Sequence, residues 1–275
     1  MVKRVGVIGL GKMGIPMTRH LLAKGHTVAA FDLRPEAVER AAKLGGKPGQ
    51  SPRAVAAESE LVIVVVGFDN EVMDVTFGKD GVLAGAKPNS VIAVASTVLP
   101  ETVKQIGARA GAAGHGVSVL DIPLCRGEPA AEDGKLLMLA GGDAAVFERC
   151  RPTFSAFAND IFLLGGLGAG QVGKLVNNLL LWTCICGNYE GLKLAQRMGV
   201  DAEVLRNALV KSSASNWALQ TWQQVRPMPW AEKDMAIVMQ EADRLRLPLP
   251  LAGIVREVIK AIKIEKGDPI PVARK

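Results

Sequence analysis

Lys174 and Asn178, four residues apart, are the pair of side chains in this sequence best suited to acid–base chemistry. The segment from about Gly170 onward is predicted to be helical, so the two side chains point to one face of the helix. A lysine in this position can donate a proton to, or accept one from, an alcohol/carbonyl pair, while the carboxamide meets the same ligand. A lysine taken alone is more often solvated, but residues 175–182 are too apolar for a surface helix. The pattern therefore predicts a lysine that faces a cleft.

A glycine-rich motif near the amino terminus predicts a dinucleotide site. Gly9, Gly11 and Gly14 follow a predicted strand and open a predicted helix, which is the context that this motif requires. The first glycine permits a tight turn, the second lets the backbone approach a pyrophosphate, and the third allows close packing of the helix. The helix N-terminus then offers amides and a positive dipole to the phosphates. We place the intervening residues in the same cofactor site: Leu10, Lys12 and Met13.

An acidic residue, Asp32, ends the next predicted strand at about the distance expected for this motif. Its carboxylate can accept hydrogen bonds from the adenosine ribose hydroxyls and would repel a 2′-phosphate, which predicts NAD as the cofactor. Arg34 leaves NADP as the alternative, because a guanidinium can stack on adenine or pair with a 2′-phosphate; it can equally be an exposed residue at a helix start. We also place Val66 and Gly67 in the cofactor site.

The first half of the chain alternates apolar runs with amphipathic stretches. The predicted strands are residues 4–8, 27–31, 61–66, 91–94 and 117–120, with 136–140 and 160–163 as further strands, and the predicted helices include 13–24, 35–44, 69–75 and 101–113. This alternation predicts an α/β domain with a doubly wound, mostly parallel sheet. Residues 61–66 are apolar at every position, as expected for a central strand covered on both faces.

Strand-like runs disappear after the glycines of residues 165–170, and helical periodicity continues almost to the end. We therefore predict a dinucleotide-binding domain over residues 1–165 and an all-α domain for substrate binding and oligomerisation over 166–275. A long interdomain helix at about 170–198 joins them. The later predicted helices are residues 201–211, 214–224, 231–245 and 249–266.

Composition excludes several classes of protein. Of the 275 residues, 49% are hydrophobic and 22% charged, which excludes a disordered chain. The net charge of +6 is scattered rather than gathered in a basic run, so we expect no nucleic-acid partner. The four cysteines lack metal-ligand spacing and are expected to be reduced thiols, with no metal site. The sequence enters its first strand without a signal-peptide pattern and has no apolar run of membrane-spanning length, so we expect a cytoplasmic protein with no membrane partner.

Five stretches in order resemble the β-hydroxyacid dehydrogenase family, which includes 3-hydroxyisobutyrate dehydrogenase, tartronate semialdehyde reductase and sulfolactaldehyde reductase. They are residues 7–14, 95–100, 121–127 with 134–136, 168–178 and 233–235. The resemblance implies a Rossmann domain, a helical domain, and an active site between them with Lys174 as the general acid/base. It also implies a homodimer or homotetramer.

The resemblance also assigns roles to individual residues. Ser96 and Thr97 match a serine–threonine pair near nicotinamide and substrate, Asn178 matches an asparagine that contacts substrate, and Lys233 matches a lysine lining the cofactor and substrate cleft. Ser96 and Thr97 also follow a predicted strand, at the edge of a parallel sheet where ligands collect. The alternative is that these two residues only cap the N-terminus of the predicted helix that begins at Glu101.

The sequence departs from the family pattern at Cys125 and Arg126, where a serine and a glycine usually precede Gly127. In the family this small polar turn holds the substrate carboxylate, so Cys125, Arg126 and Gly127 are candidate substrate-binding residues. Cys125 is a poor replacement for a hydroxyl donor, whereas the guanidinium of Arg126 suits an anion. An arginine here resembles sulfolactaldehyde reductase and predicts a longer or doubly anionic substrate. Alternatively, Arg126 points to solvent or pairs with Glu128 or Glu132.

The sequence thus predicts a reversible hydride transfer between NAD(P) and a small anionic hydroxy acid or semialdehyde. Lys174 exchanges the hydroxyl proton, and Arg126 holds a second anionic group. One alternative is an imine reductase-like enzyme, which typically has aspartate or tyrosine at the position of Lys174. Another is a catalytically silent dinucleotide-binding protein, against which the retained Lys174 and Asn178 argue.

Overall fold

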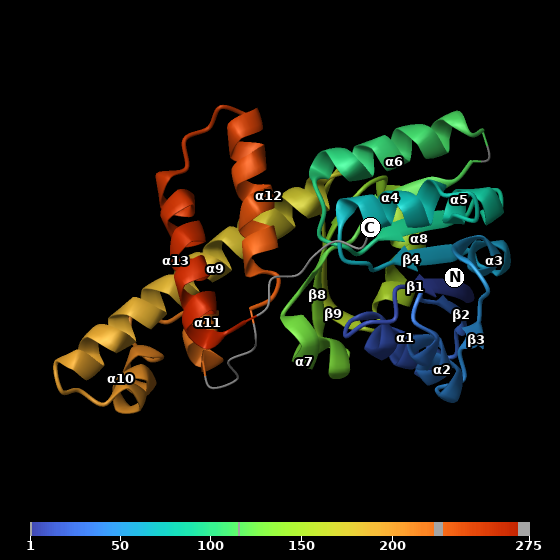
Figure 1. The fold of residues 1–275 in the computed structure, drawn as a ribbon. Helices are drawn as coiled ribbons and strands as arrows, with labels where there is room; N and C mark the ends of the chain where they lie inside the picture. Colours follow the sequence, from blue (N-terminus) through green and yellow to red (C-terminus); the bar gives the residue numbers. More distant parts are fainter. Residues whose placement is uncertain (1, 115, 223–227, 269–275) are drawn as a thin grey trace. The chain divides into compact units, whose positions relative to one another are not determined.

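The computed structural model describes residues 2–114, 116–222 and 228–268. These residues form two compact units that divide between Lys174 and Leu175. The first unit holds a sheet with its covering helices, and the second unit is helical (Figure 1). The mostly parallel α/β domain and the helical region that follows it were both predicted, and the structure confirms them.

The sheet of the first unit is parallel over its first six strands. Its strands are β1 (Arg4–Ile8), β2 (Thr27–Phe31), β3 (Lys47–Pro48), β4 (Leu61–Val64), β5 (Val91–Val94), β6 (Ser118–Asp121), β7 (Leu124–Cys125), β8 (Leu136–Gly141) and β9 (Ala158–Gly165). They lie in the order β3-β2-β1-β4-β5-β6-β8-β7, and β9 pairs with β8. β8 runs antiparallel to β6 and β7 and parallel to β9. Strand order therefore reverses at β1 and β4, the position where doubly wound sheets bind ligands.

Helices cover both faces of this sheet (Figure 1). They are α1 (Gly14–Ala23), α2 (Pro35–Lys43), α3 (Pro52–Glu58), α4 (Asp69–Phe77), α5 (Val82–Gly85), α6 (Pro100–Ala112), α7 (Gly127–Glu132) and α8 (Ala144–Phe154). Side chains of α1, α2 and α8 pack in one apolar cluster, and those of α3 to α6 pack in the other. Leu61 and Ile63 of β4 belong to the first cluster, whereas Val62 and Val64 belong to the second. The uninterrupted apolar run in β4 follows from this two-sided burial.

The second unit consists of helices. α9 (Ala169–Arg197) begins in the first unit and continues into the second, where α10 (Ala202–Leu209), α11 (Trp217–Gln220), α12 (Ala231–Arg244) and α13 (Pro250–Lys266) follow. Val255 and Ile259 of α13 are buried, and the thiol of Cys186 on α9 donates to the Val255 carbonyl at 3.8 Å. No helix among the described residues is both long enough and apolar enough to cross a membrane.

Several boundaries differ from the predicted ones. The helix predicted over 214–224 is shorter, at Trp217–Gln220, and its predicted end lies outside the described residues. Strands β3 and β7 and helices α3, α5, α7 and α8 were not predicted. The predicted domain boundary between residues 165 and 166 falls between β9 and α9, ahead of the division between the two compact units.

Candidate functional site

The candidate cofactor residues of the first unit follow the carboxyl ends of four neighbouring parallel strands. The glycine loop, residues 9–14, follows β1, and Asp32 follows β2; Val66 and Gly67 come after β4, and Ser96 and Thr97 after β5. Because the carboxyl ends of parallel strands meet at one edge, the sheet brings these residues together there. This edge is the candidate site.

The three glycines of the glycine loop meet different surroundings. A Cβ atom on Gly9, whose φ is 95°, would lie 2.3 Å from the Val65 carbonyl oxygen, and one on Gly14 would lie 1.9 Å from the Gly9 oxygen. A Cβ atom on Gly11 would meet only the Arg34 Nη2 atom, at 4.0 Å. Gly9 and Gly14 are therefore required by the fold itself. Gly11 instead faces open space beside the first turn of α1, where a pyrophosphate would fit.

Asp32 joins the glycine loop to the end of β2. Its Oδ2 atom accepts a hydrogen bond from the Leu10 amide at 2.7 Å, and its Oδ1 atom accepts from the Arg34 amide at 2.9 Å and Nε atom at 3.1 Å. Burial raises the pKa of Asp32, but the hydrogen bonds from Arg34 and Leu10 and the charge of Arg34 outweigh burial and hold the pKa below its usual value. Asp32 is thus an ionised hydrogen-bond acceptor at neutral pH, and Arg34 is its ion-pair partner.

Ser96 is buried and connects three segments of the site. Its hydroxyl accepts a hydrogen bond from the Val66 amide at 2.8 Å, and its carbonyl accepts from Nε2 of Gln171 at 2.8 Å. The Oε1 atom of Gln171 in turn accepts from the Val98 amide at 3.1 Å. The alternative role of Ser96 and Thr97 as a helix cap is wrong, because the cap residue of α6 is Leu99.

Asp121, at the end of β6, holds the start of α9. Its carboxylate is fully buried and accepts hydrogen bonds from the amides of Gly168 and Gln171, each at 2.7 Å. Burial raises the pKa of Asp121 above its usual value, although both amides act to lower it. Sequence reasoning missed Asp121 and Gln171 as site residues. The signal that could have found Asp121 is a carboxylate at the end of an apolar strand, because a buried carboxylate needs hydrogen-bond donors.

Lys174 lies in the second turn of α9 and reaches the segment around β7. Its Nζ atom donates to the Leu124 carbonyl at 2.7 Å and lies 4.0 Å from the Cys125 Sγ atom. Cys125 is itself buried. The structure thus places a half-buried ammonium beside the Cys125–Gly127 turn, which comprises three of the candidate substrate-binding residues.

Arg126 in this turn has an acidic partner other than those considered from sequence. Its Nη1 atom lies 2.6 Å from Oδ2 of Asp160 on β9. The carboxylates of Glu128 and Glu132 instead pair with Lys12 and Arg19, each at 2.9 Å. The pairing of Arg126 with Glu128 or Glu132 is therefore wrong.

Two candidate residues belong to the second unit. Asn178 is buried on α9; its Oδ1 atom accepts from Asn177 at 3.1 Å, and its Nδ2 atom has no partner within the described part of the chain. Lys233 lies in the first turn of α12, with its Nζ atom 5.5 Å from the centroid of the Trp230 ring. A buried amide donor without an acceptor is costly, so Asn178 stays a candidate for contact with a ligand.

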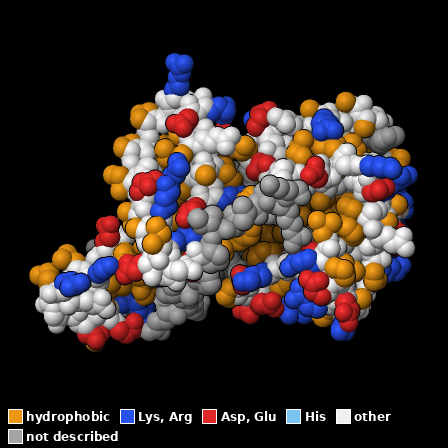
Figure 2. All heavy atoms as spheres, viewed as in Figure 1, with side chains coloured by type: hydrophobic (Ala, Val, Ile, Leu, Met, Phe, Trp, Pro, Cys, Tyr) orange, Lys and Arg blue, Asp and Glu red, His pale blue; other side chains and the backbone are white. Residues whose placement is uncertain are grey.

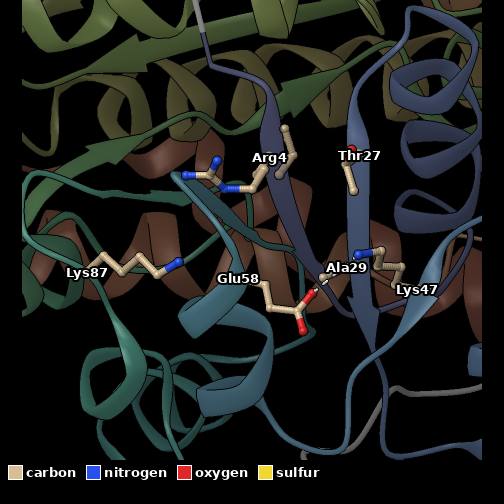
Figure 3. Close-up of a pocket in the computed structure, with 7 residues that line it drawn as sticks. Arg4, Thr27, Ala29, Lys47, Glu58 and Lys87 are labelled. Atoms are coloured by element: carbon tan, nitrogen blue, oxygen red, sulfur yellow. Dashed lines mark ion pairs between the residues drawn. The ribbon is translucent and has the colours of Figure 1, made fainter.

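A cavity of about 350 Å³ opens at the opposite edge of the sheet, at the amino ends of β1 and β2 (Figure 3). Arg4, Lys47, Glu58 and Lys87 surround it, and Lys47 and Glu58 form an ion pair at 3.9 Å. These charged side chains are exposed. This cavity is remote from the glycine loop along β1, and we assign the candidate site to the carboxyl edge because the hydrogen-bonded polar groups converge there.

The chain is similar to known dehydrogenases over nearly its whole length. A family model described as the NAD binding domain of 6-phosphogluconate dehydrogenase matches residues 4–166, and one described as NAD-binding of NADP-dependent 3-hydroxyisobutyrate dehydrogenase matches residues 168–269. The 3-hydroxyisobutyrate dehydrogenase of Pseudomonas aeruginosa is 33% identical over 92% of this chain and 90% of its own length. The 3-sulfolactaldehyde reductase of Escherichia coli is 31% identical over 92% and 88%, respectively. A solved structure of Mycobacterium tuberculosis 3-hydroxyisobutyrate dehydrogenase with L-serine has a TM-score of 0.88 and 26% identity, covering 98% of this chain and 97% of that one.

We predict that Gly11→Ala and Gly14→Ala separate ligand binding from stability. Gly14→Ala forces a methyl group onto the Gly9 carbonyl and should lower the free energy of unfolding by about 3 kcal/mol. Gly11→Ala enters open space and should change stability by less than about 0.5 kcal/mol, while weakening NADH binding about tenfold or more. Urea unfolding and NADH fluorescence titration measure the two effects. Equal NADH affinity in Gly11→Ala and the native protein would contradict the assignment of the pyrophosphate to this loop.

A second prediction concerns Asp121. Asp121→Ala leaves the buried amides of Gly168 and Gln171 without their acceptor and should lower the free energy of unfolding by about 3 kcal/mol. Asp143→Ala is the control, because Asp143 also accepts an amide hydrogen bond at a helix start, from Val146 at 2.9 Å, but is exposed. We expect this control to cost only about 1 kcal/mol. Equal losses in urea unfolding would show that Asp121 is an ordinary cap.

Proposed function

The chain belongs to the β-hydroxyacid dehydrogenase family and is an NAD(P)-dependent oxidoreductase of hydroxy acids, and from this premise we propose how its own residues carry out the reaction. The observation that carries the proposal is the position of Lys174. Its ammonium lies at the Cys125–Gly127 turn, on a helix whose start is fixed by Asp121 at the carboxyl edge of the sheet.

Lys174 is the proposed general acid/base. In alcohol oxidation its Nζ atom, as the neutral amine, accepts the hydroxyl proton of the substrate and becomes an ammonium; in the reverse direction the ammonium donates a proton to the carbonyl oxygen and becomes the amine. The hydrogen bond from Nζ to the Leu124 carbonyl, at 2.7 Å, holds the long side chain in place. When bound, the nicotinamide accepts the hydride in oxidation and supplies it in reduction.

The remaining candidates orient the two ligands. Ser96 keeps a hydroxyl proton to donate after accepting from Val66, and the unpartnered amide of Asn178 offers a donor one helical turn from Lys174. Cys125 and Gly127 shape the turn around the substrate, and Arg126 is proposed to lie at the distal end of the substrate, where its guanidinium bears on whether a second anionic group is accepted.

The proposed cofactor is NAD in preference to NADP. Gly11 leaves room for the pyrophosphate, and the ionised Asp32 accepts ribose hydroxyls and repels a 2′-phosphate. Arg34 is bonded to Asp32, so its guanidinium is already neutralised by that carboxylate. We assign the other cofactor contacts to Lys12, Val66, Gly67, Thr97 and Lys233.

A steady-state assay tests this function. Native protein should oxidise a small 3-hydroxy acid with NAD at a higher kcat/KM than with NADP. Lys174→Ala should lower kcat about a thousandfold while leaving NADH affinity unchanged, because it removes proton transfer and no cofactor contact. Lys43→Ala is the control, since Lys43 is exposed and pairs with Glu39 on α2. Retained turnover in the Lys174 variant would contradict its role, and turnover of cyclic imines alone would favour an imine reductase.

We further propose that the protein is a cytoplasmic homo-oligomer in which a second copy covers an exposed stripe of α9. Val176, Leu180 and Leu194 are 52%, 60% and 62% exposed, and hydrophobic side chains are visible on the outside of the helical unit (Figure 2). A helix period of 3.6 residues places Gly187 on the same stripe, and a Cβ atom there would meet nothing within 4 Å. An apolar stripe with a small residue at its centre suits a closely packed partner helix.

Light scattering on a size-exclusion column tests the oligomer. The native protein should elute as a dimer or tetramer, and Gly187→Arg should shift it to a monomer because the new side chain occupies the stripe. Gly111→Arg is the matched control on α6 of the first unit, where a Cβ atom also meets nothing within 4 Å. A monomeric native protein would refute the proposal.

A further inference from the structure

Arg126 has an unusual backbone conformation for its residue type. Its φ of 79° and ψ of −3° lie in the left-handed region, between the end of β7 at Cys125 and the start of α7 at Gly127. A residue with a Cβ atom is strained there, whereas glycine is not. The strain persists only where surrounding contacts fix the residue.

The guanidinium of Arg126 is fixed by β9. Its Nη1 atom lies 2.6 Å from Oδ2 of Asp160 and donates to Oδ1 of Asn159 at 2.9 Å and to the Lys135 carbonyl at 3.2 Å. Asp160 and Cys125 are both aligned with Leu137 of β8, so Arg126 reaches across one strand to make this ion pair. The side chains of Arg126 and Asp160 remain 36% and 40% exposed, so a solute can approach the pair.

The same turn touches the proposed acid/base. Leu124, two residues before Arg126, accepts the hydrogen bond from Lys174 Nζ at 2.7 Å. A substrate whose hydroxyl reaches Lys174 therefore lies beside the turn that carries Arg126. Any second anionic group of that substrate meets the guanidinium of Arg126, which is already paired with the carboxylate of Asp160. Attraction to the cation is then offset by repulsion from Asp160.

We propose that Asp160 is a specificity-determining residue that restricts the substrate to one anionic group. Its carboxylate acts as an internal counter-ion for Arg126, so a doubly anionic hydroxy acid must displace Asp160 before it gains an ion pair. This inference rests on the proposed function and adds to it the charge class of the substrate. Removal of the carboxylate at Asp160 converts the turn into a receptor for a second anion.

The test compares two substrates of equal length that differ by one charge, 2-(hydroxymethyl)glutarate and its distal monoamide. The native enzyme should have the higher kcat/KM for the monoamide. Asp160→Asn keeps an acceptor for Arg126 but removes the charge, and it should raise the diacid-to-monoamide ratio about fivefold, as expected for a half-exposed charge pair. Asp160→Ser is the second variant and should give a rise of similar size.

Two controls isolate the ion pair. Glu128→Gln removes a carboxylate two residues from Arg126 that pairs with Lys12 at 2.9 Å, and it should leave the ratio unchanged. In an Arg126→Ala background, Asp160→Asn should lose its effect on the ratio. An unchanged ratio in both active Asp160 variants would overturn the inference while the proposed function stands. If the native protein oxidised neither of these substrates nor any other hydroxy acid, the proposed function itself would be refuted.

Discussion

The Asp121 carboxylate lies fully buried at the end of β6 and accepts the amides of Gly168 and Gln171 at the start of α9. A charge in this position is stabilised by amide donors and by the positive end of the helix dipole. Because these bonds fix both the start and the direction of α9, they also fix Lys174, which lies in the second turn of the helix. The position of the proposed acid/base thus depends on a carboxylate that does not contact it.

Close packing against the sheet provides the second constraint on α9. A Cβ atom on Gly170 would lie 2.6 Å from the Leu139 carbonyl oxygen, and one on Gly173 would lie 2.4 Å from a methyl group of Leu164. The glycines that precede Lys174 therefore allow the helix to approach β8 and β9. The side-chain amide of Gln171 then bonds to the backbone at Ser96 and Val98, which aligns α9 with the end of β5. The glycines of this segment serve packing, as Gly9 and Gly14 do in the glycine loop, whereas Gly11 of that loop faces open space.

Sequence reasoning was most successful where one local signal determines the structure. The apolar run of β4 and the glycine loop after β1 depend on neighbouring residues alone; the loop follows its strand as predicted, and β4 begins where predicted but ends at Val64, two residues before its predicted end. β7 has only two residues, too few for a periodic pattern, and α8 carries Pro152 within its last turns. Asp121 and the partner of Arg126 were missed for another reason. Their hydrogen bonds join residues that are distant in sequence, and only the strand order brings these residues together.

α1 and α9, two of the helices that begin at the carboxyl edge, differ in how their N-termini are satisfied. α9 receives the Asp121 carboxylate of the same chain. α1 has no acidic residue in its first turn and no side-chain cap at Met13, and a Cβ atom on Gly11 beside it would meet open space. Helix N-termini attract anions through their amides and dipole. One N-terminus is therefore used to position the helix of the proposed acid/base, and the other remains for the pyrophosphate of the cofactor. The amino edge of the sheet lacks this arrangement, because the parallel strands there follow helix C-termini, which do not attract anions.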